Sequence, residues 1–270
     1  MRHEDSGIVY KHTASPHSPN SFATMALTLN VLVKAFCLVI LLSAAACWEP
    51  TDVERAQVLE GHHRVREEVN PTASNMKLLR ISRSLEHLAA YWASKCSFRR
   101  PNPKEHPHYR GLGVNMALTV GTKPALVDSI CAWVKESKSY SYSSNTCSRR
   151  CEQYTQLIWA QTSEVGCAMR ECHGVIPDWP DPQYITVCLY SPSGNYRKGR
   201  PYLRGPSCSK CGKRERCYRN QCMRSAELNQ VCPTDRFPNP QDKYVPQCVL
   251  AQSESAQAAS ECETTSTDAQ

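Results

Sequence analysis

The chain lacks several patterns that mark common classes of protein. No Gly-x-Ser-x-Gly motif occurs, which argues against the nucleophile turn of an α/β-hydrolase. No Asn-x-Ser/Thr glycosylation acceptor exists either, because Pro71 blocks the one candidate, Asn70-Pro71-Thr72. Helix and strand patterns do not alternate regularly, so an α+β fold is favoured over a doubly wound parallel sheet. The apolar run after Lys34 is short for a membrane span of about 20 residues.

That apolar run has the features of a cleaved signal segment. It follows Met25 and the single cation Lys34, and it ends in small residues suited to cleavage near Ala44–Ala46. A signal anchor that stays in the membrane is the alternative. We expect residues 1–46 to be an extension and signal segment, with Met1 or Met25 as the start of translation. The mature protein should then be secreted and extracellular, with no stable membrane span and no nucleic-acid partner.

Cysteine is abundant, with sixteen among 270 residues. In an oxidising compartment this density predicts disulfides rather than a metal site. Almost no apolar side chain occurs from Cys208 to Cys222, so cross-links must hold that piece together. The composition predicts a globular domain at 48–200, a basic cysteine-rich hinge at 201–224 and an acidic, largely disordered tail at 225–270.

Apolar spacing and capping residues predict the helices and strands. Helices are expected from Thr51 or Asp52 to Asn70, over 84–93 with Ser84 as the cap, from Pro124 to about Lys138, and from Tyr154 to about Gln161. Strands are expected at 112–120, 165–172 and 184–190. Cys131 falls in the third helix, where we expect a buried free thiol.

Five ordered motifs resemble the CAP superfamily, which comprises cysteine-rich secretory proteins, antigen 5 proteins and pathogenesis-related proteins of group one. Residues 153–168, Q-Y-T-Q-L-I-W-A-Q-T-S-E-V-G-C-A, are similar to the family's H-Y-T-Q signature. Residues 187–196, V-C-L-Y-S-P-S-G-N-Y, are similar to its second signature. The other motifs are H-H-R-V-R at 62–66, W-V-K-E at 133–136, and R-P-Y at 200–202 with the C-x-x-C that follows. The pattern is closest to members with a C-terminal hinge.

The resemblance implies a three-layer α–β–α sandwich with a central antiparallel sheet, cross-linked by disulfides. The family's pairing would join Cys96 with Cys172, Cys167 with Cys188, Cys208 with Cys217, and Cys211 with Cys222. We add a local bridge between Cys147 and Cys151 and another between Cys232 and Cys248.

Many members of the family carry two histidines and two glutamates in a central cleft, a set that can bind a divalent metal. The corresponding positions here are Arg100, Val114, Glu136 and Gln153. Arginine is no metal ligand at ordinary pH, valine cannot be one, and glutamine is a weak one. We therefore expect a degenerate cleft with no zinc or magnesium and no cofactor.

Two other arrangements of this cleft are open. His106 or His108 could swing in beside Glu136, although one imidazole and one carboxylate are too few for a closed metal site. Arg100 could instead form an ion pair with Glu136 where the metal would be.

The intact structural motifs beside a broken cleft favour a secreted, non-enzymatic binding protein with no catalytic residues. By analogy with the family, its partners would be an extracellular protein, or a lipid or sterol. A second hypothesis is a module for sulfated glycans or anionic surfaces, because ten Lys/Arg and one acid lie between Arg197 and Arg224. Its candidate residues are Arg204, Lys210, Lys213, Arg214, Arg216 and Arg219. A secreted peptidase inhibitor is the third, although no exposed reactive loop is recognisable.

Overall fold

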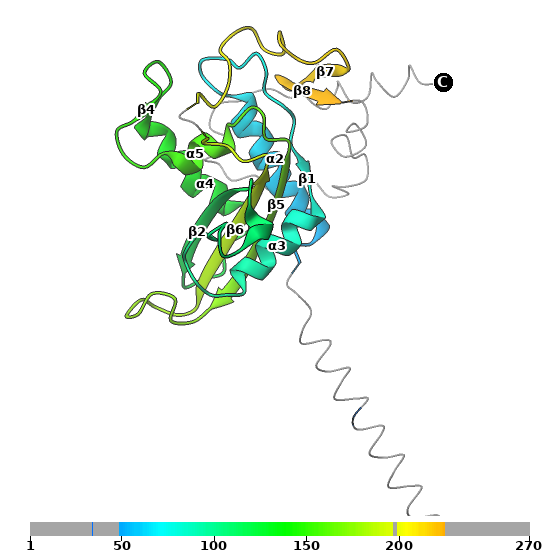
Figure 1. Ribbon diagram of the computed structural model, residues 1–270. Coiled ribbons are helices and arrows are strands. Elements are labelled where there is room, and N and C mark those ends of the chain that lie inside the picture. The colour runs from blue at the N-terminus through cyan, green and yellow to red at the C-terminus, as the bar shows by residue number, and fades with distance from the viewer. Residues whose placement is uncertain (1–33, 35–48, 197–198, 225–270) are drawn as a thin grey trace, which may run out of the picture. The chain divides into compact units, whose positions relative to one another are not determined.

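A computed structural model of the chain describes residues 34, 49–196 and 199–224 (Figure 1). The expected signal segment, the acidic tail and the Cys232–Cys248 bridge lie outside the described residues. The chain divides into two units, Met1–Cys47 and Trp48–Gln270, and every helix and strand named below belongs to the second.

A four-stranded sheet in the order β1-β5-β6-β2 forms the centre of this unit. β5 (Glu164–Cys172) and β6 (Gln183–Ser191) pair antiparallel, and β2 (Gly113–Val120) pairs antiparallel with the other edge of β6. The short strand β1 (Arg80–Ile81) pairs parallel with β5, so the sheet is mixed and not antiparallel throughout. Parallel pairing is possible because β1 and β5 are far apart in the sequence, and the long connection returns the chain to the same end of the sheet.

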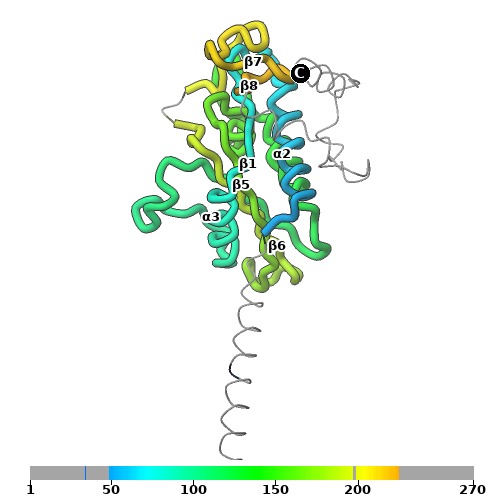
Figure 2. The backbone as a smooth tube through the Cα atoms, turned by 90° about the vertical axis from the view of Figure 1, so that its right-hand side faces the viewer, coloured from blue at the N-terminus to red at the C-terminus, as the bar shows by residue number. Residues whose placement is uncertain are grey.

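Two helices cover the opposite faces of the sheet, as Figure 2 shows. α2 (Asp52–Glu67) begins after Thr51, one of the two predicted caps, with a capping box in which the Thr51 hydroxyl accepts from the Glu54 N–H at 3.2 Å. α3 (Arg83–Ala93) covers the other face. The three-layer α–β–α sandwich expected from the resemblance is therefore confirmed.

Three helix boundaries differ from those expected. α3 begins after Ser82, two residues before the expected cap. The expected start at Pro124 is wrong: α4 (Asp128–Val134) begins later, because the Asp128 carboxylate accepts from the Ala125 N–H at 2.9 Å in a turn that precedes the helix. The 3₁₀ helix η2 (Lys135–Ser139) continues α4.

The third difference concerns α5 (Glu152–Leu157), which ends before the expected Gln161. The backbone leaves the helix because its next peptide groups bond to other segments. Ala160 donates to the Pro201 carbonyl at 2.7 Å and accepts from the Lys77 N–H at 3.0 Å.

A hydrophobic core lies on each side of the sheet. One contains Met76, Trp133, Leu157 and Tyr190 and packs beneath α2, α4 and α5; the other packs α3 against the strands. In the second core, Gly166 lets α3 approach β5, since a Cβ there would lie 2.3 Å from the Glu86 backbone nitrogen. Only glycine fits so close a contact between two backbones.

Arg66 on α2 is fully buried and pairs with no carboxylate among the residues that the structure describes. Its guanidinium donates to the carbonyls of Leu157 and Trp159 at 2.8 and 2.9 Å. It also donates to the carbonyls of Lys77 and Thr162 at 2.6 and 3.1 Å. Burial lowers its pKa to about 9. Arg66 thus holds together the end of α5, the start of β5 and the segment before β1.

The remaining elements are short. The 3₁₀ helix η1 (Pro107–Tyr109) lies in the loop after α3. β3 (Tyr140–Ser141) and β4 (Thr146–Cys147) form one small hairpin. β7 (Glu215–Tyr218) and β8 (Gln221–Arg224) form another. Among the residues described, no helix is long and apolar enough to cross a membrane.

Five disulfides join the same pairs that were expected. They are Cys96–Cys172, Cys147–Cys151, Cys167–Cys188, Cys208–Cys217 and Cys211–Cys222. Cys131 was expected to be a buried free thiol, and that expectation is wrong: it is half-buried and disulfide-bonded. So many disulfides are typical of proteins that fold in an oxidising compartment.

Candidate functional site

The four cleft positions come from four different elements. Arg100 lies in the loop after α3, Val114 on β2, Glu136 in η2 and Gln153 in α5. The structure brings Glu136 and Gln153 into contact, with Gln153 Nε2 donating to Glu136 Oε1 at 3.3 Å.

Glu136 caps the N-terminus of α5. Its Oε2 accepts from the backbone N–H groups of Gln153 and Tyr154 at 2.9 and 3.3 Å. The first N–H groups of a helix have no partner within the helix, and a carboxylate there is stabilised by the helix dipole. Glu136 therefore has a structural role in this fold.

Gln153 ties α5 to the edge of the sheet. Its Oε1 accepts from the Met116 N–H on β2 at 2.9 Å, and its own carbonyl accepts from Asn115 Nδ2 at 2.9 Å. β2 is an edge strand, so these peptide groups have no neighbouring strand to bond. On the same edge, Trp133 Nε1 donates to the Met116 carbonyl at 3.2 Å.

The other two cleft positions, Val114 and Arg100, do not join the contact between Glu136 and Gln153. Val114 is half-buried, pairs with Leu189 and packs on the core beneath α3. Arg100 is exposed and interacts with Glu136 only through longer-range electrostatics, so the ion pair considered as an alternative is absent from the described part of the chain.

The histidines of the loop after α3 do not complete a metal set. The His106 ring packs edge-on against Trp92, with ring centroids 4.9 Å apart, and therefore belongs to the α3 side of the loop. His108 is exposed in η1.

A buried chain of polar groups lies between α2 and the sheet. His62 is fully buried, and its Nδ1 must carry the hydrogen, because it faces the Val58 carbonyl at 2.7 Å. The Tyr190 hydroxyl then donates to His62 Nε2 at 3.0 Å, and Asn115 Nδ2 donates to that hydroxyl at 3.4 Å. Burial, with the nearby Arg66 charge, lowers the pKa of His62 to about 3. His62 is thus a neutral packing residue.

The hinge is docked firmly on the domain. Backbone bonds join Leu78 N to the Cys222 carbonyl at 3.0 Å and Cys222 N to the Met76 carbonyl at 2.6 Å. Gln221 Nε2 donates to the His63 carbonyl at 3.2 Å. β8 therefore continues into contacts with the segment before β1 and with α2, and the hinge forms no separate body.

The structure contradicts the prediction that Arg219 is one of the polyanion-binding residues. Its side chain is only 8% exposed and pairs with Glu60 at 2.7 Å and Glu67 at 2.8 Å, both on α2. A guanidinium held by two carboxylates is not available to an anionic ligand. The other five candidates are exposed and form no ion pair among the described residues: Arg204, Lys210, Lys213, Arg214 and Arg216.

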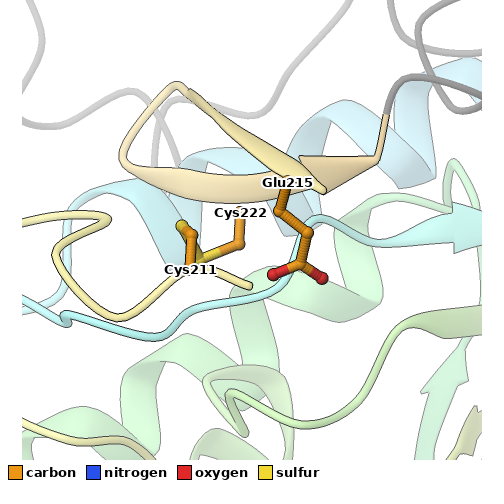
Figure 3. A group of neighbouring side chains, drawn as sticks. All are labelled: Cys211, Glu215 and Cys222. Atoms are coloured by element: carbon orange, nitrogen blue, oxygen red, sulfur yellow. A yellow bond between two sulfur atoms is a disulfide. The ribbon is translucent and has the colours of Figure 1, made fainter. Parts of the chain in front are cut away.

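Only one group in the described part of the chain has metal-ligand types within reach of one another: Cys211, Glu215 and Cys222 (Figure 3). The two sulfur atoms are bonded to each other, so neither is a thiolate. Glu215 accepts from Lys77 Nζ at 2.7 Å. The group therefore fastens the hinge and does not fit a metal.

A small pocket of about 280 Å³ opens beside α5. Its polar groups bond to one another: Thr155 Oγ1 donates to Asn195 Oδ1 at 2.8 Å, and Asn195 Nδ2 donates to the Glu152 carbonyl at 2.7 Å. The lining is Tyr140, Asn145, Cys147, Glu152, Thr155, Trp159, Asn195, Gly199 and Pro201. Since ligand pockets usually span about 300–1,000 Å³, this one suits a small or partly inserted group.

The sequence did not predict the buried hydrogen bonds of Arg66 or those of the Asn115–Tyr190–His62 chain. It also did not predict the ion pairs through which Arg219 holds the hinge on α2. The available signal for the first two was position: His62 and Arg66 are four residues apart on the apolar stripe of the predicted first helix. A polar residue on a buried stripe must find internal hydrogen bonds.

The fold, the disulfides and the signature segments define the class of protein. The chain belongs to the cysteine-rich secretory protein family, the CAP family, whose model matches residues 59–190.

Among its relatives, GLIPR1-like protein 1 of Homo sapiens is 36% identical over 191 residues, which cover 67% of this chain and 77% of the relative. Peptidase inhibitor 15 of Xenopus laevis is 32% identical over 193 residues, covering 65% of this chain and 72% of the relative.

Solved structures share the fold. BmVAL-1 superposes with a TM-score of 0.56 at 23% identity, over 65% of this chain and 96% of that one. NaASP2, solved with Zn2+, has a TM-score of 0.53 at 24% identity, over 66% and 98% of the two chains.

Proposed function

We propose that the protein is a secreted, non-enzymatic binding protein with a CAP domain at 48–200 and a basic hinge at 201–224. Its metal cleft is degenerate, and its loops and hinge contact extracellular partners: a protein, a lipid or sterol, or a sulfated glycan. The small pocket beside α5, which Trp159 and Pro201 help to line, could take only part of a lipid or sterol.

The observation that carries the proposal is the use made of Glu136 and Gln153. Together they hold η2, α5 and the edge of β2 through four hydrogen bonds to backbone and side-chain groups. The remaining positions are Arg100 and Val114, which offer no metal ligand. Where many members of the family have two imidazoles and two carboxylates, this chain has one carboxylate, and that carboxylate caps a helix. These residues do not fit a zinc or magnesium ion.

Calorimetric titration with zinc tests the cleft. We expect no stoichiometric heat with the native chain, and stoichiometric binding after the set is restored by Arg100→His, Val114→Glu and Gln153→His. Adding Glu136→Ala to the restored variant should abolish that binding. Sub-micromolar binding by the native chain that is lost in Glu136→Ala would contradict the proposal.

Polyanion binding is the second candidate, and the exposed hinge cations favour it. Arg204, Lys210, Lys213, Arg214 and Arg216 are exposed on a hinge that is fixed to the domain. Fixed cations without carboxylate partners attract sulfated chains, and removing any one of these cations should weaken the salt dependence of binding.

Heparin chromatography tests this candidate. The native chain should elute above physiological salt, and neutralising Lys213, Arg214 and Arg216 to alanine should move elution to lower salt. The matched control removes three exposed cations elsewhere, Lys104, Arg110 and Arg149, with the same change in net charge. Equal shifts in the two variants would mean that net charge alone, and not the hinge, binds heparin.

A further inference from the structure

The loop between β5 and β6 forms an exposed tip at one end of the sheet, whereas the β7–β8 hairpin lies at the opposite end (Figure 1). Trp179 in this tip is 52% exposed, and Val120 at the neighbouring end of β2 is 36% exposed. An exposed tryptophan is uncommon on a surface that meets only water, and tryptophan is enriched where proteins bind one another.

The tip is held in one shape by Gln183, which is fully buried. Its Oε1 accepts from the Ile176 N–H at 3.0 Å, and its Nε2 donates to the carbonyls of Ile176 and Trp179 at 3.1 and 3.4 Å. Asp181 Oδ1 accepts from the Gly174 N–H at 3.1 Å. A loop fixed in this way loses little conformational entropy when it binds.

The tip is acidic, although the whole chain has a formal net charge of +7. Glu171, Asp178 and Asp181 are exposed around Trp179. In the part of the chain described, none of the three forms an ion pair with a lysine or arginine; only His173 lies near, 3.7 Å from Glu171 and 3.6 Å from Asp181. The tip therefore presents an apolar centre beside three exposed carboxylates, none of which forms an ion pair with a lysine or arginine among the described residues.

The hinge surface at the other end is complementary. Leu203 is 48% exposed. It lies beside the hinge cations, because Ser74 N donates to the Leu203 carbonyl at 2.8 Å while Lys210 N donates to the Ser74 carbonyl at 2.9 Å. This end presents an apolar side chain among exposed cations, which include Arg204, Lys210 and Lys213.

We propose that the Trp179 tip of one copy docks on the basic hinge of a second copy, head to tail. The two surfaces lie at opposite ends of one unit, so the contact is heterologous and adds copies in open chains rather than closing a two-fold dimer. A tip contact is small, so the association is weak, and paired surface charges make it sensitive to salt. It shares the hinge cations with the proposed polyanion site but does not require polyanion binding.

Sedimentation velocity of the full chain tests the proposal. The weight-average sedimentation coefficient should rise with protein concentration at low ionic strength, and the rise should be lost at high salt and in Trp179→Ala. The Glu105→Lys control changes an exposed acid far from the tip in sequence and should still associate. A coefficient that stays monomeric at every concentration overturns the proposal.

Charge reversal identifies the two surfaces. One variant carries Glu171→Lys and Asp178→Lys, and the other carries Lys210→Glu, Lys213→Glu, Arg214→Glu and Arg216→Glu, so that the reversed charges outnumber the remaining hinge cations, which include Arg204. Each alone should be monomeric, because its tip and hinge then have the same sign, and an equimolar mixture should associate again. Near-ultraviolet circular dichroism like that of the native chain shows that each variant is folded.

A mixture that stays monomeric, or association that persists in both single variants, overturns the docking proposal and points to a different partner for the tip. Heparin elution separates this outcome from failure of the polyanion candidate. Reversal of the tip should leave heparin binding by the hinge in place, whereas reversal of the hinge should remove both.

Discussion

At the residue scale, burial decides what the polar side chains of α2 do. His62, His63 and Arg66 lie on its buried side, and each bonds to a backbone carbonyl. His63 Nε2 donates to the Leu79 carbonyl at 2.9 Å. The sequence predicts that both histidines belong to the first helix, and the fold shows that the helix face on which they lie is covered.

The two buried histidines predict a pH dependence of stability. Burial is the first cause that lowers their pKa values, to about 3 for His62 and about 4 for His63. Both values lie below that of an unfolded histidine, so the unfolded chain binds more protons and stability falls as pH falls. Between about pH 6 and 5 the free energy of unfolding should decrease by about 1.4 kcal/mol per pH unit for each histidine. Urea unfolding at several pH values, with disulfides intact, measures the slope.

His63→Gln should remove the contribution of one histidine to that slope, about 1.4 kcal/mol per pH unit. The exposed control His108→Gln should leave the slope unchanged. Glu60 does not interfere in this window. Although burial raises its pKa, Arg219 outweighs burial and lowers it to about 2, so its contribution to stability is lost only at more acidic pH, as pH falls from its usual value of 4.5. An unchanged slope in His63→Gln would mean that His63 is charged in the folded state.

At the element scale, the β7–β8 hairpin uses its charges in two different ways. The sequence predicts a basic piece held by cross-links, and all its cations look equivalent there. In the structure, Arg219 points back to α2 and pairs with Glu60 and Glu67, whereas Arg216 is exposed. The difference arises because Arg219 lies in the turn between the strands, with φ of 48°, and that turn rests on α2.

Arg219→Met should destabilise the protein by about 3 kcal/mol, because removing one partner of a buried pair leaves the other charge uncompensated. Arg216→Met, on the exposed neighbour, should change the free energy of unfolding by less than about 0.5 kcal/mol. Urea unfolding compares the two variants. Adding Glu60→Gln to Arg219→Met should recover part of the lost free energy of unfolding. If Arg219→Met and Arg216→Met destabilise the protein equally, Arg219 does not stabilise the docked hairpin.

At the scale of the whole molecule, local patterns and signature segments predict the order of the helices and strands. The features that they do not predict depend on contacts between distant parts of the chain. The helix cap at Thr51 and the strands around Cys167 and Cys188 are confirmed because their determinants are local or lie within the signatures. The start of α4 was predicted wrongly because a turn at Ala125 decides it. The bonded state of Cys131 was predicted wrongly because the sequence alone does not show which cysteines pair.

The same reasoning applies to the candidate site. The prediction that the cleft holds no metal rests on the residue types at Arg100, Val114 and Gln153, which can be read directly from the sequence. The new roles of Glu136 and Gln153 could not be predicted, because they depend on how α5 approaches the free edge of β2.

The docked hinge predicts that the domain and the hinge unfold as one cooperative unit. A two-stranded hairpin is not stable alone, and undocking this one would break its backbone bonds to Met76 and Leu78 and leave Glu60 and Glu67 without Arg219. Native-state hydrogen exchange should therefore give the Cys222 amide the same opening free energy and denaturant slope as that of Val187 in the core of β6. The Thr146 amide, in the separate β3–β4 hairpin, should exchange through smaller local openings. A smaller denaturant slope for Cys222 than for Val187 would show that the hinge detaches while the domain stays folded, and the surface available to partners would then change with that motion.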